Sequence, residues 1–137
     1  MTKFYIATGL ENIKKHNLLR DSLVEKGHQI TYDWTITGNE KSSSLERLNE
    51  IAHVMLEDGV KGAELIVVIL PGGKGTHTEL GAGLAYGKQI LLYSDDPECF
   101  MACEKTCGFY YHTNVSQFTE MNGLMRAFEK MGSKTLV

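Results

Sequence analysis

The sequence predicts a single α/β domain built around a parallel sheet, and three observations support that prediction. Strand-like apolar segments alternate with helix-like segments along the 137 residues. The run at 64–70 (ELIVVIL) is short and almost wholly apolar, which is typical of a strand buried on both faces. The length suits one domain, and no linker, repeat or low-complexity tract divides it. We therefore treat residues 1–137 as one domain.

Each element in the first half is expected from its local pattern. Residues 3–8 (KFYIAT) predict the first strand. Residues 12–26 predict a helix, because apolar positions recur at helical spacing and Gly27 follows its end. Residues 28–33 (HQITYD) alternate like a strand, while residues 34–43 are polar and predict a loop.

The second half continues the alternation. Residues 45–58 predict a helix, and Ser43 with Glu46 forms a candidate capping box at its start. The further elements expected are a strand at 64–70, a helix at about 77–87, a strand at 89–94, a helix or turn at 97–107, a strand at 108–112 and a helix at 117–131. Such alternation with right-handed crossovers indicates a flavodoxin-like, doubly wound α/β domain with about five parallel strands. Ligands of these sheets bind beyond the carboxyl ends of the strands.

Composition and charge narrow the function classes. The net charge of −3 argues against a nucleic-acid partner, which would favour a basic face. No signal peptide and no apolar segment of membrane-spanning length is present, so we expect a cytoplasmic protein with no membrane partner. The spacing of Cys99, Cys103 and Cys107 differs from the C-x2-C pattern of zinc and iron–sulfur sites. We expect reduced, buried thiols there rather than a metal site.

The segment from Leu70 to Gly81 (LPGGKGTHTELG) is the strongest candidate for a ligand site. Gly72, Gly73 and Gly75 let the backbone approach a ligand closely. The start of the following helix supplies free N–H groups that suit a phosphate or a sugar hydroxyl. The segment is neither a G-x-G-x-x-G fingerprint nor a Walker loop, so ATP hydrolysis is not expected.

Glu79 is the candidate acid of this segment, and two roles stay open for it. A nucleophile needs the ionised form, which a position near a helix N-terminus favours. Alternatively, Thr76 and Glu79 form a capping box, in which the glutamate satisfies a backbone N–H at the helix start. The two roles do not exclude each other.

The stretch Pro71–Glu79 (PGGKGTHTE) resembles the P-G-G-x-G-T-x-x-E motif of LOG-type nucleotide phosphoribohydrolases. Over about residues 4–94, the wider pattern is more similar to the nucleoside 2-deoxyribosyltransferase family and its nucleotide N-hydrolase relatives. The similarity includes a first strand such as Phe4–Ala7, a strand such as Glu64–Leu70 followed by G-T-x-x-E-L-G, and the G-K-x-I step at Gly87–Ile90.

This resemblance implies a reaction and its catalytic groups. Glu79 would attack C1′ of the sugar as the base departs, and the glycosyl-enzyme would pass to another base or to water. Tyr5 would orient the nucleophile through its hydroxyl. The family's second acid would fall at Leu56, and Asp58 is the nearest residue that could replace it. Asp58 could equally be a solvated acid near a helix end.

Further substrate contacts are expected from the loops that follow the strands. Trp34 could stack on a base that bonds to Asp33, although a lone tryptophan could also seal an oligomer interface. His77 could touch a phosphate, and Asn114 resembles an asparagine that a neighbouring subunit contributes in the family. The expected substrate-binding residues are Thr8, Gly9, Asp33, Trp34, Gly72, Gly73, Gly75, Thr76, His77 and Asn114.

The expected function is therefore cleavage or transfer at the N-glycosidic bond of a (deoxy)nucleoside or nucleoside 5′-monophosphate. The resemblance implies no metal and no organic cofactor, a small-molecule nucleoside or nucleotide as partner, and a homo-oligomer. One alternative is a non-catalytic nucleotide-binding or sensor module. Another is an NAD-cleaving domain of the TIR type, against which the glycine-loop spacing speaks.

Overall fold

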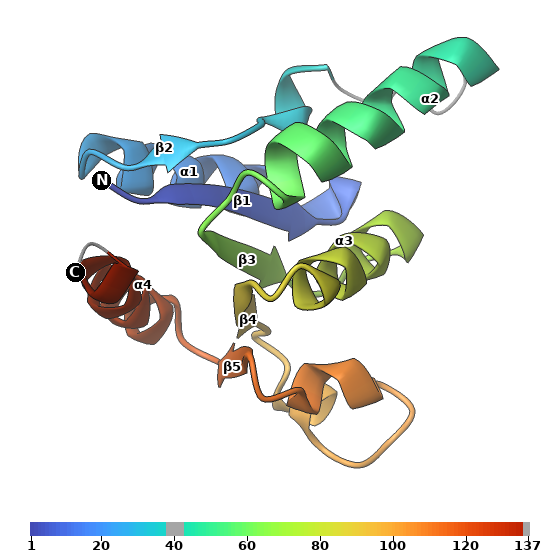
Figure 1. The fold of residues 1–137 in the computed structure, drawn as a ribbon. Helices are drawn as coiled ribbons and strands as arrows, with labels where there is room; N and C mark the ends of the chain where they lie inside the picture. Colours follow the sequence, from blue (N-terminus) through green and yellow to red (C-terminus); the bar gives the residue numbers. More distant parts are fainter. Residues whose placement is uncertain (38–42, 136–137) are drawn as a thin grey trace.

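A parallel five-stranded sheet forms the centre of the protein (Figure 1). The computed structural model describes residues 1–37 and 43–135. The strands lie in the order β2-β1-β3-β4-β5, and every neighbouring pair is parallel. Their bounds are β1 (Lys3–Thr8), β2 (Gln29–Ile30), β3 (Leu65–Ile69), β4 (Gln89–Tyr93) and β5 (Val115–Phe118). This order is that of a flavodoxin-like, doubly wound α/β domain, which confirms the predicted fold class.

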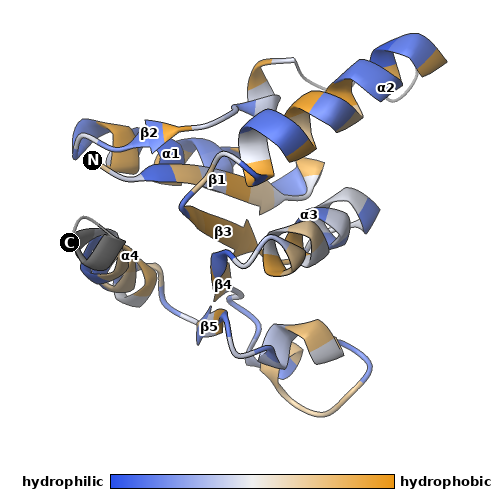
Figure 2. Cartoon of the chain, viewed as in Figure 1, coloured by the Kyte–Doolittle hydropathy of each residue, from blue (hydrophilic) through white to orange (hydrophobic). Residues whose placement is uncertain are grey.

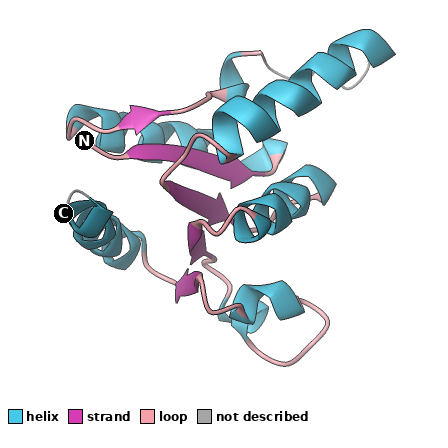
Figure 3. Ribbon diagram, viewed as in Figure 1, coloured by secondary structure: helices cyan, strands magenta, loops and turns pink. Residues whose placement is uncertain are grey.

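Helices cover both faces of the sheet, as Figure 3 shows. The α-helices are α1 (Ile13–Glu25), α2 (Leu45–Val54), α3 (Lys74–Ala85) and α4 (Met121–Thr135). Shorter helical segments are η1 (Leu10–Asn12), η2 (Trp34–Ile36), the π-helical η3 (Met55–Val60), η4 (Pro97–Phe100) and η5 (Gly108–Tyr111). α1 and α4 pack on one face, and α3 with η3 packs on the other.

Alternating residues of β1 pack into two hydrophobic clusters, one on each face of the sheet. Phe4 and Ile6 pack with Phe128 of α4 on one face, while Tyr5 and Ala7 face the other side. All five residues of β3 are buried, which confirms that this strand is covered on both faces. Side chains on the Tyr5 face therefore reach the same layer as α3 and the loop before it.

The expected strand at 108–112 is wrong. That aromatic run forms η5, a 3-10 helical turn, which buries Tyr110 but leaves Phe109 and Tyr111 exposed. β5 lies further along, at Val115–Phe118, and it pairs only with β4 at the sheet edge. The last helix accordingly begins at Met121 instead of residue 117.

Other boundaries also differ from the expectation. The helix expected at 45–58 changes at Met55 into η3. Ser44, not Ser43, caps α2 by accepting a hydrogen bond from the Arg47 N–H at 3.0 Å. The expected loop at 34–43 begins with η2, and positions 38–42 lie outside the described residues. α3 starts at Lys74, three positions before the expected start.

Two further findings concern only the residues that the structure describes. Within those ranges, no helix combines the length and apolar character needed to cross a membrane. In the same part of the chain, histidine, cysteine, aspartate and glutamate side chains do not gather in threes or more at a place that could hold a metal ion.

Candidate active site

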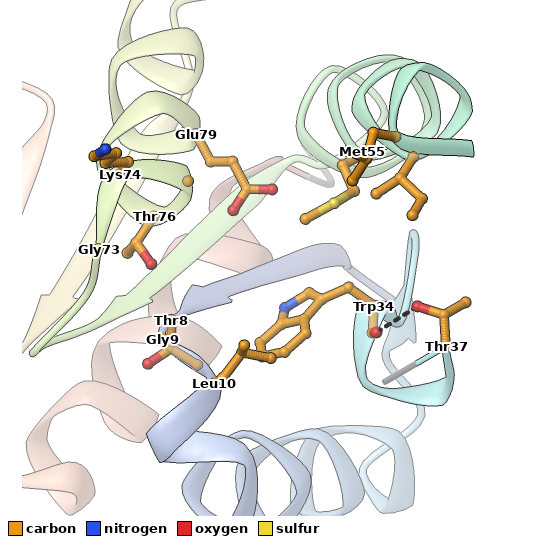
Figure 4. A pocket seen from close by; sticks show the side chains of 13 residues that line it. Thr8, Gly9, Leu10, Trp34, Thr37, Met55, Gly73, Lys74, Thr76 and Glu79 are labelled. Carbon is orange, nitrogen blue, oxygen red and sulfur yellow. Dashed lines mark hydrogen bonds between the residues drawn. The ribbon is translucent and has the colours of Figure 1, made fainter. Parts of the chain in front are cut away.

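A pocket of about 640 Å³ opens beyond the carboxyl ends of β1 and β3 (Figure 4). Its position agrees with the rule that ligands of doubly wound sheets bind at this edge. The loop after β1, the turn at Trp34, the apolar side of α2 and the start of α3 form its walls. The lining residues are Thr8, Gly9, Leu10, Trp34, Thr37, Leu48, Ile51, Met55, Gly73, Lys74, Gly75, Thr76 and Glu79.

Glu79 lies in the second turn of α3, because that helix begins at Lys74 with Gly73 as its N-cap. Thr76 is the third residue of the helix, and no side chain caps the N-terminus. The capping-box role considered for Thr76 and Glu79 is therefore wrong. Figure 4 shows the carboxylate extending from α3 into the pocket, while the side chain is only 5% exposed.

The Tyr5 hydroxyl donates a hydrogen bond to Oε2 of Glu79. Burial raises the pKa of Glu79 from 4.5 to about 7, although the hydrogen bond from Tyr5 acts to lower it. Burial therefore disfavours the ionised form of Glu79 near neutral pH, contrary to the expectation that its place near the helix N-terminus keeps it ionised. Burial, and then the nearby Glu79 charge, raise the pKa of Tyr5 well above its ordinary value, so the phenol stays a donor.

Gly59 of η3 makes room for the Tyr5 ring. A Cβ atom on Gly59 would lie 2.7 Å from Cε1 of Tyr5, which is closer than real Cβ contacts allow. The carbonyl of Gly59 accepts a hydrogen bond of 2.7 Å from the Thr31 hydroxyl. The π-helical segment is therefore fitted against the tyrosine that holds Glu79, in keeping with the frequent occurrence of such bulges near functional sites.

Side-chain hydrogen bonds join the ends of β1 and β3 at the floor of the pocket. The Thr8 hydroxyl donates to the Ile69 carbonyl at 2.7 Å and accepts from Asn12 Nδ2 at 3.0 Å. Asn12 Nδ2 also lies 3.0 Å from the Pro71 carbonyl. Thr8 and Asn12 therefore fix the backbone from which the glycine loop begins.

Asp33 anchors the turn that carries Trp34. Its carboxylate accepts hydrogen bonds from the Thr35 N–H at 3.0 Å and from Arg20 Nη1 at 2.7 Å. Burial acts to raise the pKa of Asp33, but the bonds from Thr35 and Arg20 outweigh it and hold that pKa below its ordinary value. Trp34 donates from Nε1 to the Ile6 carbonyl at 2.8 Å, so its indole is held against β1.

The apolar wall opposite Trp34 comes from α2 and the start of η3. Leu48, Ile51 and Met55 line the pocket, and no residue of α2 is buried in the core. Figure 2 shows both hydrophobic and hydrophilic residues along α2, in contrast to the hydrophobic β3. The helical spacing of these side chains is typical of an apolar helix face, but the sequence does not reveal that this face lines a cavity instead of the core.

The structure brings seven of the predicted binding and catalytic residues to the pocket wall, with Tyr5 directly behind Glu79. The seven are Thr8, Gly9, Trp34, Gly73, Gly75, Thr76 and Glu79. Leu10, Thr37, Leu48, Ile51 and Met55 were not among the predicted binding residues, and their apolar or small side chains carry no sequence signal for binding.

Besides Tyr5, five predicted residues do not line the pocket. Gly72 lies just before it, where a Cβ would collide with the Thr76 side chain. His77 faces Tyr110, and Asp33 faces Arg20. Asp58 is exposed on η3. Asn114 precedes β5 and so lies at the opposite, amino edge of the sheet, because β5 starts one residue later.

Comparisons with known proteins concern the fold of the whole chain. No family model matches the sequence, and no curated protein matches it. Among solved structures, the chain is similar to the CMP N-glycosidase BcmB of Clostridium botulinum, with a TM-score of 0.61 and 18% sequence identity. The similarity covers 93% of this chain and 98% of the other. The chain therefore has a fold that is also found in a nucleotide N-glycosidase.

Proposed function

We propose that this protein cleaves the N-glycosidic bond of a nucleoside 5′-monophosphate or a (deoxy)nucleoside, with Glu79 as the nucleophile. The observation that carries the proposal is the buried Glu79 carboxylate, bonded to Tyr5 and directed into a pocket with a glycine loop on one side. The similarity in fold to a CMP N-glycosidase supports the same class of reaction.

The pocket suits the two ends of such a substrate. Trp34 and the apolar side chains of Leu48, Ile51 and Met55 offer flat and aliphatic surface to a base. Gly73 and Gly75 bring the first backbone N–H groups of α3 to the pocket wall, where a sugar hydroxyl or phosphate can accept them. Glu79 lies on the same helix, one turn further on, and lines the same pocket.

The reaction then proceeds in two steps. Glu79 attacks C1′ through an oxocarbenium-like transition state, and the C1′–N bond breaks with its electron pair going to the base. The base takes a proton from water. A water molecule, or the nitrogen of an acceptor base, next attacks C1′, breaks the ester bond to Glu79 and loses its proton, which restores the carboxylate. Tyr5 holds Glu79 in line throughout by its hydrogen bond.

Base release tests this proposal directly. The protein is incubated with nucleosides, nucleoside 5′-monophosphates and NAD, with and without an acceptor base, and free base is followed by chromatography. We expect turnover in the wild type and a loss of at least about a thousandfold in Glu79→Gln, since the nucleophile is gone. Glu25→Gln, an exposed glutamate at the end of α1, is the matched control and should keep full activity. Turnover that persists in Glu79→Gln would sink the assignment.

A second candidate is a nucleotide-binding module without catalysis. It is favoured by one observation: among the described pocket residues, Glu79 is the single carboxyl group, and Asp58 is not one of the lining residues. This candidate predicts nucleotide binding with no release of base from any compound of the panel. Cleavage of NAD alone would instead favour the TIR-type alternative.

A further inference from the structure

The segment between β4 and β5 packs against the site through Tyr110. Figure 3 shows this connection as loops and short helical turns. Tyr110 lies in η5, is 4% exposed and belongs to the same core cluster as Tyr5 and Trp34. The Phe100 ring meets it edge-on, with ring centroids 6.4 Å apart. The Tyr110 side chain is thus held in place by packing beside the glycine loop.

His77 joins Tyr110 to that loop. Its Nε2 lies 2.7 Å from the Tyr110 hydroxyl, and the two rings stack at 5.8 Å between centroids. On its other side, Nδ1 lies 2.8 Å from the Gly73 carbonyl. The same carbonyl accepts the backbone N–H of His77 at 3.2 Å. The N-cap carbonyl of α3 therefore accepts two hydrogen bonds from the same residue.

The acceptors in this series of hydrogen bonds determine which atom donates the proton in each bond. A carbonyl has no proton to donate, so the proton between His77 and Gly73 is on Nδ1. In the neutral ring Nε2 is then an acceptor, and the Tyr110 hydroxyl donates to it. Burial, with smaller contributions from Cys107 and Cys99, raises the pKa of Tyr110 to about 12, so the phenol keeps this proton at neutral pH.

We propose that Tyr110 is a positioning residue for substrate binding: acting through His77, it holds the Gly73 carbonyl and hence the loop that lines the pocket. Tyr110 and His77 are themselves not among the lining residues, whereas Gly73, Lys74 and Gly75 are. Glu79 is held separately by Tyr5. Loss of the Tyr110 bond should therefore weaken binding and leave the chemical step nearly intact. This inference deepens the proposed function and rests on it.

The test replaces Tyr110 by phenylalanine, which keeps the ring and removes only the hydroxyl. With cytidine 5′-monophosphate as the probe substrate, we expect KM to rise about tenfold, the effect of one good hydrogen bond, with kcat within about twofold of the wild type. Tyr111→Phe is the matched control, since Tyr111 is the neighbouring, exposed tyrosine of the same turn, and it should change neither constant.

A double-mutant cycle separates positioning from general packing. If Tyr110 acts through His77, Tyr110→Phe should have no further effect on KM in a His77→Phe background. In addition, the 15N shifts of the His77 ring should report a proton on Nδ1 in both proteins, with the Nε2 shift displaced in Tyr110→Phe by the loss of its hydrogen-bond donor. An unchanged KM, a fall in kcat in its place, or additive effects in the cycle would overturn the proposal.

Binding measured without turnover keeps this result apart from the proposed function. In a Glu79→Gln background, the fluorescence of Trp34, the single tryptophan, reports the dissociation constant of cytidine 5′-monophosphate. A tenfold weaker binding on adding Tyr110→Phe supports the positioning role even if the wild type releases no base. Turnover in the wild type with no effect of Tyr110→Phe on either constant overturns the positioning role alone. A wild type that neither binds nor cleaves any compound of the panel overturns both.

Discussion

Glu79 shows how burial makes one carboxylate different from the other acids of the chain. Its pKa of about 7 in the folded protein exceeds the 4.5 of an ordinary glutamate. Between these two values the folded state holds a proton that the unfolded chain has lost, so the free energy of unfolding falls as the pH rises and levels off above about pH 7. The shift corresponds to roughly 3 kcal/mol.

Glu79→Gln should remove this pH dependence. The difference in free energy of unfolding between the variant and the wild type should stay nearly constant between about pH 3 and 4. By about pH 8 that difference should have shifted in favour of the variant by up to about 3 kcal/mol. Urea unfolding at each pH measures the difference. Glu25→Gln, at an exposed position, should run parallel to the wild type. A constant difference between Glu79→Gln and the wild type across this range would contradict the raised pKa.

Tyr5→Phe tests the other half of the pair. The hydrogen bond from Tyr5 lowers the pKa of Glu79, so its loss should raise that pKa further, by about one unit if the bond contributes roughly 1.4 kcal/mol. The rising limb of kcat/KM against pH should move upward by the same amount. A 13C NMR titration of the carboxyl group gives the pKa without relying on activity. Tyr86→Phe, at a half-exposed ring outside the pocket, is the control and should leave the curve in place.

At the scale of elements, α2 is an apolar helix face that lines a cavity. Leu48 and Ile51 are only half-buried, whereas Val60 in the following η3 is fully buried. Leu48→Ala and Ile51→Ala should each cost less than about 1 kcal/mol of stability but weaken nucleotide binding several-fold. Val60→Ala should cost about 2 kcal/mol of stability and leave nucleotide binding nearly unchanged. Urea unfolding and Trp34 fluorescence titration measure the two effects; equal stability losses in all three variants would mean that α2 packs into the core.

The same elements show what could be predicted from the sequence. β3 was correctly predicted because burial on both faces requires a continuous apolar run. β5 was misplaced because an edge strand is half-exposed and its VSQF sequence carries little apolar signal, while the aromatic run before it looks more strand-like. Local pattern also fails at η3, where Gly59 lies against the ring of Tyr5 in β1, a residue distant along the chain.

The site was predictable in part for a related reason. Glycines and a carboxylate that follow a predicted buried strand are a local pattern, so the loop and Glu79 can be predicted from the sequence. The apolar wall, the pairing of Asp33 with Arg20 and the contact of His77 with Tyr110 depend on segments distant along the chain. Such contacts are set by packing and leave no local pattern. The sequence predicts Asp33 and His77 as ligand contacts, but it gives no sign that each is bonded to a neighbouring part of the protein.

At the scale of the whole molecule, the two faces of the sheet have separate tasks. Phe128 of α4 packs edge-on against Phe4 with ring centroids 5.8 Å apart, on the face away from Tyr5 and the pocket. Because distant, independent sites contribute additively, a change in the Phe128 core should lower stability without altering the gain from bound ligand. Phe128→Leu should cost about 1–2 kcal/mol. In a Glu79→Gln background, cytidine 5′-monophosphate at about 100 times its dissociation constant should add about 2.7 kcal/mol with or without this substitution. Trp34→Leu, on the pocket face, should lose most of that gain at the same ligand concentration, as measured by urea unfolding with and without nucleotide. A smaller gain in Phe128→Leu would show instead that the two cores are coupled through the sheet, and that the pocket depends on the packing of the entire domain.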